Sequence, residues 1–292
     1  MKRRAFIASG LSSALCGGAW AGEKKPLGLN AETFRQAIVA TEQQSGGRLG
    51  VAMLDVASGD RFAYRGDERF ATCSTFKLAL SACILHQVDR KKRRLSDTLA
   101  VRAGDLVANS PLTTQWAGHR ASLADLCMAT MTRSDNAAAN LLYPLAGAPA
   151  GLTQFLRGLG DKSTRLDRME TELNSAIPGD PRDTTMPLAM LGVLESLLVG
   201  QALSPAGRDQ LLNWMLANKT GDNRFRAGLP AGWKTGDKTG AGDHGTDNDI
   251  GIVWPPARGP VLFSCYLTQS TMEFPASNVI HAQIARALVA EL

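Results

Sequence analysis

One segment of the chain is apolar on almost every side of a helical projection. It runs from Ser74 to Arg90 and reads "STFKLALSACILHQVDR". A surface helix carries an apolar stripe on one side only, whereas a helix that is apolar all round must be covered on every side. The segment therefore predicts a central helix, and the rest of the chain must supply its cover. At 44% hydrophobic residues the chain has ample material for such a core.

Strand patterns lie on both sides of a long helical stretch. Residues 48–70 read as two strands around an Ala-Ser-Gly-Asp turn, and three more strands and a helix follow from about Gly232. We expect the early hairpin and the late meander to share one antiparallel sheet, with the helices inserted between them. An active site would then lie at the junction.

These patterns predict an α+β protein. Its α/β sandwich domain, an antiparallel sheet flanked by helices, would be discontinuous and would comprise residues 22–74 and 219–292. An all-helical domain would be inserted between them, over residues 75–218. Within it, a polar loop rich in Gly and Pro is long enough to be functional.

The first 21 residues have the features of a signal peptide. A basic start and a short apolar run precede a small-x-small site that ends at Ala21. Arg3 and Arg4 resemble a twin-arginine signal, which implies export after folding. The apolar run is too short to span a membrane. We therefore expect a periplasmic protein without a membrane association once residues 1–21 are removed.

Charge, cysteine and histidine patterns exclude several classes of function. Without its leader the chain loses Lys2, Arg3 and Arg4 and no acid, so its formal net charge falls from +5 to +2. The basic cluster from Arg90 to Arg94 ends the apolar segment, where cations suit the negative end of a helix, and no aromatic residues are interleaved. A nucleic-acid partner is therefore not predicted. A metal ion is not predicted either, because the histidines and cysteines lack the spacing of metal ligands, and no other cofactor is expected.

Two short motifs are candidates for chemistry. "CSTFK" places Ser74 and Lys77 three residues apart, on one face of a helix. A serine hydroxyl becomes a good nucleophile when a neighbouring base takes its proton. "TRSDNAAANLL" places Ser134 and Asn136 around Asp135. Both motifs also suit plain helix caps, which favour Ser, Asp and Asn.

A third motif occurs twice, in "GWKTGDKTGAGDHG". Lys234 and Lys238 each begin a Lys-Thr-Gly sequence, and residues four apart on a strand point to the same face. The alternation of side chains therefore does not choose between them. The two lysines would lie about 13 Å apart along the strand, at roughly 3.3 Å per residue.

In their order along the chain, Ser-x-x-Lys, Ser-Asp-Asn and Lys-Thr-Gly resemble the signature of the serine β-lactamases and penicillin-binding proteins. Over essentially the whole mature chain the sequence resembles the class A β-lactamases. The family pattern, Trp followed by Asp-Lys-[Ser/Thr]-Gly and a small residue, selects Lys238, with Trp233 and Asp237 ahead of it.

The resemblance extends to the long polar loop. "RLDRMETELN" is similar to the class A omega loop, here about 165–183, with Glu170 and Asn174 at the positions of its water-holding pair. Arg168 and Asp183 match the ion pair that closes the loop. A carboxylate at this place would activate a water for hydrolysis.

The resemblance implies a role for each matched residue. Ser74 would attack the lactam carbonyl, with Lys77 and Glu170 as alternative bases for its proton, and Ser134 would pass a proton to the leaving nitrogen. The backbone N–H groups of Ser74 and Ala241 would form the oxyanion hole. The implied set is catalytic Ser74, Lys77, Ser134 and Glu170, with substrate-binding Asn136, Asn174, Lys238, Thr239, Gly240, Ala241 and Arg224.

The carboxylate site departs from the family pattern. Some members carry an arginine on the strand after Lys-Thr-Gly, where this chain has Asp247. Arg224 matches the alternative arginine of other members, although a surface cation at a helix end is an equally simple interpretation. Asn109 stands where an aromatic residue is usual at the site entrance.

The cysteines also depart from the disulfide-bearing members. Gly242 occupies the position of the disulfide partner of Cys73, and Ser81 occupies that of Cys127. Cys83 is two residues from Ser81 and so lies on a different face of the helix. We therefore expect free thiols, and the missing bridge at Cys73 weakens the expectation of carbapenem hydrolysis.

The expected function is hydrolysis of penicillins and cephalosporins by a monomer, through an acyl-serine intermediate, with resistance to these antibiotics as the result. A D-Ala-D-Ala peptidase shares the three motifs but lacks the loop with Glu170 and Asn174. A β-lactam sensor, acylated once, would be tethered to a transmembrane transducer, and no such segment is predicted here.

Overall fold

The computed structural model describes residues 29 and 31–291. The predicted signal peptide, residues 1–21, lies outside this range, as do residues 22–28 at the start of the predicted sandwich domain. Within the described part, none of the helices is both long and apolar enough to cross a bilayer.

A five-stranded antiparallel sheet joins the two ends of the chain, as predicted. Its spatial order is β2-β1-β9-β8-β7. In register, β1 pairs with β9 from Arg48 opposite Thr268 to Asp55 opposite Val261. The strands are β1 (Arg48–Asp55), β2 (Arg61–Tyr64), β7 (Lys234–Gly242), β8 (Thr246–Trp254) and β9 (Val261–Thr268).

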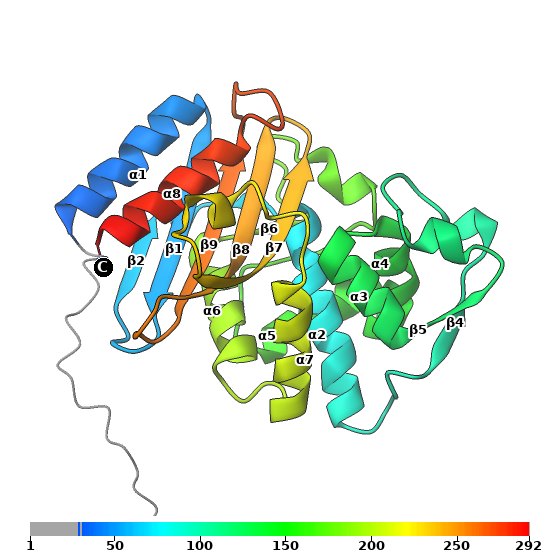
Figure 1. Cartoon of the computed structure of the whole chain (residues 1–292). Coiled ribbons are helices and arrows are strands. Elements are labelled where there is room, and N and C mark those ends of the chain that lie inside the picture. Colours follow the sequence, from blue (N-terminus) through cyan, green and yellow to red (C-terminus); the bar gives the residue numbers. More distant parts are fainter. Residues whose placement is uncertain (1–28, 30, 292) are drawn as a thin grey trace, which may run out of the picture.

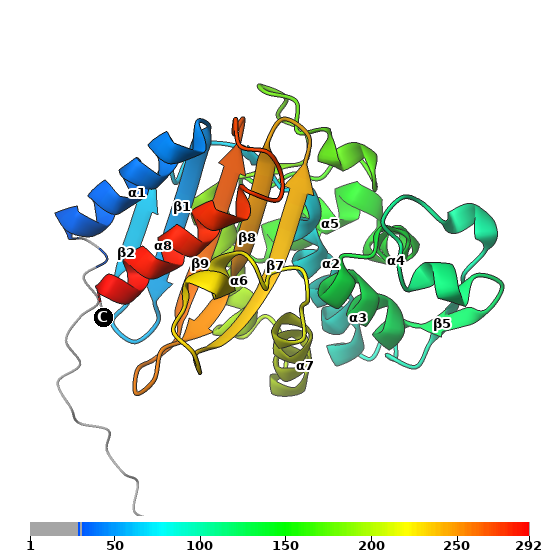
Figure 2. The same cartoon turned by 45° about the horizontal axis from the view of Figure 1, so that its top comes forward.

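Helices cover both faces of this sheet. α1 and α8 lie side by side across one face (Figures 1 and 2), where they bury residues such as Phe34 and Ile284 against the strands. The other face is covered by α6, whose neighbours continue into the helical part of the molecule. The bounds are α1 (Glu32–Ser45), α6 (Pro187–Leu198) and α8 (Asn278–Ala290). The α+β sandwich predicted from the sequence is confirmed.

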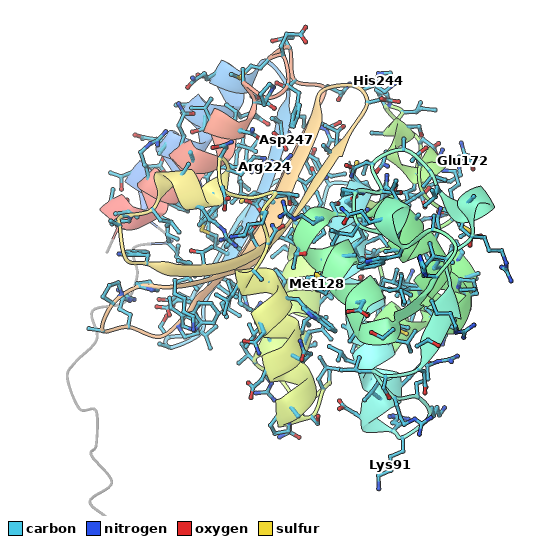
Figure 3. The ribbon with its side chains drawn as sticks, turned by 45° about the vertical axis from the view of Figure 1, so that its right-hand side comes forward. Lys91, Met128, Glu172, Arg224, His244 and Asp247 are labelled. Carbon is cyan, nitrogen blue, oxygen red and sulfur yellow. The ribbon has the colours of Figure 1, made fainter. Side chains whose placement is uncertain are left out.

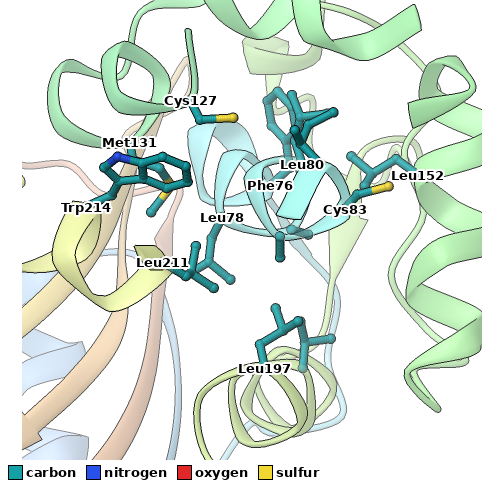
Figure 4. Close-up of a cluster of buried hydrophobic side chains, with 14 of the residues drawn as sticks. Phe76, Leu78, Leu80, Cys83, Cys127, Met131, Leu152, Leu197, Leu211 and Trp214 are labelled. Carbon is teal, nitrogen blue, oxygen red and sulfur yellow. The ribbon is translucent and has the colours of Figure 1, made fainter. Parts of the chain in front are cut away.

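The apolar segment forms the central helix that its composition predicts. α2 spans Phe76–Asp89, and its first ten residues, 76–85, are all buried. Figure 4 shows side chains of the surrounding helices packed around it, among them Met131, Leu152 and Trp214. These helices are α3 (Leu123–Arg133), α4 (Asn136–Leu142), α5 (Ala148–Gly158) and α7 (Pro205–Leu216).

Two short ribbons lie outside the main sheet. β3 pairs with β6, and β4 pairs with β5, so the predicted helical stretch also contains strands. Their bounds are β3 (Phe70–Ala71), β6 (Thr184–Thr185), β4 (Thr98–Ala100) and β5 (Arg120–Ser122). Strands of two or three residues are too short to show the alternation by which a strand is recognised in sequence. The β3–β6 ribbon anchors the end of the omega loop beside the start of α2.

Candidate active site

Ser74 lies where the central helix begins. It belongs to the single 3₁₀ turn η1 (Cys73–Thr75), which runs directly into α2, and it is 7% exposed. Lys77 follows on the first turn of α2, and its Nζ donates a hydrogen bond to Ser74 Oγ at 2.9 Å. The predicted contact between the two side chains is therefore present.

Lys77 is fully buried in a shell of oxygen atoms. Its Nζ donates to Ser134 O at 2.8 Å and to Asn136 Oδ1 at 2.5 Å, and it lies 2.9 Å from Glu170 Oε1. Burial lowers the pKa of this ammonium group, and the Glu170 carboxylate opposes the shift. The amine is therefore easier to deprotonate than an exposed lysine and can exchange a proton with its neighbours.

The Ser-Asp-Asn motif serves both as a cap and as part of the site. Asp135 is the N-cap of α4 and accepts a hydrogen bond from the backbone N–H of Ala138 at 2.9 Å. Ser134, at φ 55° in the left-handed region, ends α3. This reversal between two helices presents the hydroxyl of Ser134 and the amide of Asn136 to Lys77.

The omega loop brings Glu170 to the nucleophile. Ser74 Oγ donates to Glu170 Oε1 at 3.2 Å, and Asn174 Nδ2 donates to Glu170 Oε2 at 2.5 Å. A short 3₁₀ helix, η5 (Glu172–Ser175), gives Asn174 its position. The predicted pair thus lies in contact, next to Ser74.

The backbone of Glu170 is fixed by Asn140, a residue outside the three motifs and not predicted from the sequence. Asn140 Oδ1 accepts the Glu170 N–H at 3.0 Å, and its Nδ2 donates to the Glu170 carbonyl at 2.8 Å. One amide side chain therefore satisfies both backbone groups of Glu170. The sequence pattern that could have indicated Asn140 is its spacing. It lies four residues after Asn136 and therefore on the same face of α4.

The predicted ion pair closes the loop. Arg168 Nε lies 2.6 Å from Asp183 Oδ2, and the side chain of Asp183 is inaccessible to solvent. Asp183 Oδ1 also accepts the backbone N–H groups of Asp167 and Arg168, at 2.7 and 3.0 Å. One carboxylate thus holds both ends of the loop together.

Of the two Lys-Thr-Gly copies, the second lies at the site. Lys238 is buried, and its Nζ donates to Ser134 Oγ at 3.2 Å and to Thr239 O at 2.8 Å. Burial and the nearby charge of Lys77 hold the pKa of Lys238 well below its usual range. Lys234 is exposed at the start of β7, where its ammonium lies 5.7 Å from the ring centre of Trp254.

Gly240 allows β7 to approach η1 closely. A Cβ atom at this position would lie 3.0 Å from Thr72 O and 3.2 Å from Ser74 N. Both neighbours are at the start of the nucleophile helix, so a side chain would push the strand away from it. The glycine is therefore required by the packing that sets Ser74 beside Thr239 and Ala241.

These elements enclose one cavity of about 400 Å³. Phe274, 62% exposed, stands on its wall, and Asn109 lines it as well. Phe274 gave no signal in the sequence, because it comes from a loop before α8 that carries none of the motifs. The lining residues are Ser74, Asn109, Ser134, Asn136, Asn174, Thr220, Arg224, Thr239, Gly240, Ala241 and Phe274.

Arg224 is a buried member of this lining, so its interpretation as a surface cation is wrong. It is 4% exposed, and its Nη2 lies 2.7 Å from Asp247 Oδ1. The same cavity is lined by the other residues predicted to bind the substrate, except Lys238: Asn136, Asn174, Thr239, Gly240 and Ala241. Lys77, Glu170 and Lys238 lie in contact with its lining.

The four cysteines that the structure describes are buried free thiols, as expected. A Cβ atom on Gly242 would lie 2.7 Å from Cys73 Sγ. Position 242, where the disulfide-bearing members have the second cysteine, is therefore adjacent to the Cys73 thiol. Within residues 29 and 31–291, no group of three or more His, Cys, Asp or Glu side chains is arranged to hold a metal ion.

Comparisons with known proteins agree with this geometry. Residues 31–292 match the model of the β-lactamase enzyme family. The chain is 42% identical to β-lactamase CTX-M-8 of Citrobacter amalonaticus, over 98% of this chain and 96% of that protein. It is 45% identical to β-lactamase Toho-1 of Escherichia coli, over 88% of each.

Solved structures show the same fold. An ancestral (GNCA) class A β-lactamase is 53% identical with a TM-score of 0.88, covering 89% of this chain and 100% of that one. A β-lactamase from Xanthomonas campestris pv. campestris is 48% identical with a TM-score of 0.86, covering 87% of this chain and 96% of that one. The chain belongs to the β-lactamase enzyme family, and within it to the class A enzymes.

Proposed function

We propose that the protein hydrolyses penicillins and cephalosporins through an acyl-enzyme on Ser74 and thereby confers resistance to them. The observation that carries the proposal is the position of Ser74 Oγ, 2.9 Å from Lys77 Nζ and 3.2 Å from Glu170 Oε1, on the wall of a cavity. A nucleophile in contact with two proton acceptors is the arrangement that covalent acyl transfer needs. The relatives named as β-lactamases support the substrate class.

Acylation begins with attack of Ser74 Oγ on the lactam carbonyl carbon. The hydroxyl proton passes to Lys77 or Glu170, and both lie within hydrogen-bonding distance. The carbonyl oxygen gains the negative charge and is stabilised by the backbone N–H groups of Ser74 and Ala241. As the C–N bond breaks, the lactam nitrogen takes a proton from Ser134, whose Oγ lies 3.3 Å from Lys77 Nζ and can be reprotonated from there.

Deacylation needs a water molecule and a base. Once Ser74 is esterified it has no proton to give to Glu170, so that carboxylate is free to accept one from water. Asn174, bonded to Glu170 Oε2, supplies an amide to orient the same water. The water oxygen attacks the ester carbonyl, and the proton is returned to Ser74 when the product leaves.

The substrate carboxylate would bind beside Lys238, where Ser134, Thr239 and Arg224 line the cavity. Lys238, Ser134 and Thr239 supply an ammonium and two hydroxyl groups there, and Arg224 adds a guanidinium. Asn136 would hold the acyl side chain, since it lines the cavity and its Nδ2 donates only one N–H, to Ala108 O, which leaves the second for a ligand. Gly240 keeps the strand close enough for these contacts.

We further propose that the protein is exported to the periplasm by its leader, residues 1–21, and acts there as a monomer. N-terminal sequencing of protein recovered from the periplasm should begin at residue 22. The eluted mass of that protein in size-exclusion chromatography should match one chain.

The hydrolysis proposal is tested by a turnover count. Residues 22–292 mixed with a large excess of a chromogenic cephalosporin are expected to open many substrate molecules per enzyme. A burst of about one molecule, with a stable adduct on Ser74 by mass spectrometry, would instead mean that the acyl-enzyme is not hydrolysed. The peptidase or the sensor interpretation would then replace this proposal.

The two Lys-Thr-Gly copies provide a matched pair of variants. Lys238→Ala is expected to lower kcat/KM for the cephalosporin by about 10² or more, because it removes a buried cation that would face the substrate carboxylate. Lys234→Ala, four residues away on the same strand, is expected to leave kcat/KM within a factor of two. Steady-state kinetics on both variants give the two kcat/KM values. Equal losses of kcat/KM in the two variants would contradict the assignment of Lys238 to the substrate carboxylate.

A further inference from the structure

The cavity wall at Arg224 continues into a buried polar cluster that the proposed reaction does not use. The cluster contains Asp247 of β8, with Ser277, Asn278 and His281 at and near the start of α8. Figure 3 shows Arg224 beside Asp247, between β8 and the last helix. In the register of the sheet, Asp247 lies opposite Ala241, so it is on the strand next to the Lys-Thr-Gly strand.

The guanidinium of Arg224 is held on four sides. Its Nε donates to Asn278 Oδ1 at 2.9 Å. Its Nη1 donates to the carbonyl oxygens of Gly240, at 2.9 Å, and Asn248, at 2.6 Å. Its Nη2 lies 2.7 Å from Asp247 Oδ1. Three of the five N–H groups are therefore donated to neutral acceptors. Of the two on Nη2, one faces Asp247 and the other is left for a ligand.

The nitrogen available to a ligand is thus the one that Asp247 contacts. Asp247 is itself fixed from the other side, where Ser277 Oγ donates to its Oδ2 at 2.8 Å and His281 Nε2 lies 3.2 Å from its carbonyl oxygen. Both partners of the ion pair are almost inaccessible to solvent. A buried guanidinium that loses its carboxylate partner is strongly destabilised in place, and an alternative orientation toward solvent becomes favourable.

We propose that Asp247 is a positioning residue, which holds Arg224 Nη2 at the cavity wall so that it can bind the carboxylate of the substrate. The inference rests on the proposed function, and it explains the departure at this strand position. The chain has no arginine at this strand position, and the aspartate there orients an arginine that comes from a different segment.

Two roles of Asp247 predict opposite effects of removing its negative charge. If Asp247 only repelled the substrate carboxylate, which has the same negative charge, its loss would strengthen the attraction of the site for an anionic substrate. If it positions Arg224, its loss weakens that attraction. We expect the second result, because Arg224 is 4% exposed and no longer has a compensating charge in contact when Asp247 is neutral.

The experiment compares a penicillin with its neutral methyl ester. The folded parent enzyme should prefer the free acid, and Asp247→Asn should reduce this preference, measured as the ratio of kcat/KM values, about tenfold. The change should lie mainly in KM for the acid, since an interaction made equally in ground and transition states alters KM. An unchanged or increased preference for the acid would overturn the proposal.

Three further variants serve as controls. Ser277→Ala removes a hydrogen bond from the same carboxylate but keeps its charge, so it should lower the melting temperature without changing the acid-to-ester ratio. Arg224→Gln and the Arg224→Gln/Asp247→Asn double variant should have equal ratios, because Asp247 acts through Arg224. A lower ratio in the double variant would show that Asp247 acts independently.

The same measurements distinguish this inference from the proposed function. Failure of the parent enzyme to turn over the penicillin would contradict the proposed function. Normal turnover by the parent, with the acid-to-ester ratio of Asp247→Asn unchanged, would contradict only the role of Asp247. Where Asp247→Asn alone does not fold, the double variant, which carries no unpaired buried charge, is compared with the parent, and an acid-to-ester ratio as high as that of the parent would overturn the proposal.

Discussion

Glu170→Gln is expected to stop the protein at the acyl-enzyme. The amide keeps the size of the side chain and its contact with Asn174 but cannot take a proton from water. General base catalysis typically contributes about 10² to 10⁴ in rate, so deacylation should slow by that order. Mass spectrometry after mixing with a cephalosporin should show a persistent adduct on Ser74, and a chromogenic substrate should give a burst of about one molecule per enzyme.

The matched control is Glu172→Gln. Glu172 lies two residues further along the same loop, is exposed, and is labelled at the surface in Figure 3. Its replacement should leave turnover unchanged. The rate of the burst in Glu170→Gln also separates the two candidate bases, because a fast burst means that Lys77 suffices for acylation. Deacylation at the parent rate would contradict the mechanism.

Asp183→Ala is expected to cause the largest loss of stability. The carboxylate that it removes is paired with Arg168 and also satisfies the backbone N–H groups of Asp167 and Arg168. Breaking a buried pair by removing one partner costs about 3–5 kcal/mol, because the other charge is left uncompensated. The free energy of unfolding, from urea titration followed by circular dichroism, should fall by this amount.

Activity should fall with it, because Glu170 lies two residues from Arg168 and depends on the closed loop. The control is Asp180→Ala, which breaks a pair in the same loop with Arg182, whose side chain is 48% exposed and therefore stays solvated without its partner. That variant should keep the urea midpoint and the turnover of the parent. Equal destabilisation by both substitutions would mean that Asp183 has no special role in closing the loop.

Features encoded over a few residues could be predicted from the sequence. The contact between Ser74 and Lys77 follows from a spacing of three on a helix, and the buried helix follows from an apolar run without a polar face. The pairing of the first and last strands follows from the order of the elements. In each case the relevant geometry is local or is set by which surfaces must be covered.

Features that depend on the distance between remote segments could not be predicted. The bonds from Asn140 to Glu170 join α4 to the omega loop, and Phe274 reaches the cavity from a loop near the C-terminus. The ion pair of Arg224 with Asp247 is the clearest case. The sequence indicated a missing arginine at one position and a spare arginine at another, but only the fold places the two side chains in contact.

The strand order has a consequence for the time course of folding. β9, the last strand to be synthesised, lies between β1 and β8, so the first hairpin cannot join the sheet until the chain is nearly complete. Lys238 likewise follows its partner Ser134 by 104 residues. Pairing across such separations closes long loops and is slow compared with helix formation. The helices around α2 can therefore form while the chain is still growing, whereas the cavity comes into existence only at the end, and a chain stopped before Val261 would contain the nucleophile without an active site.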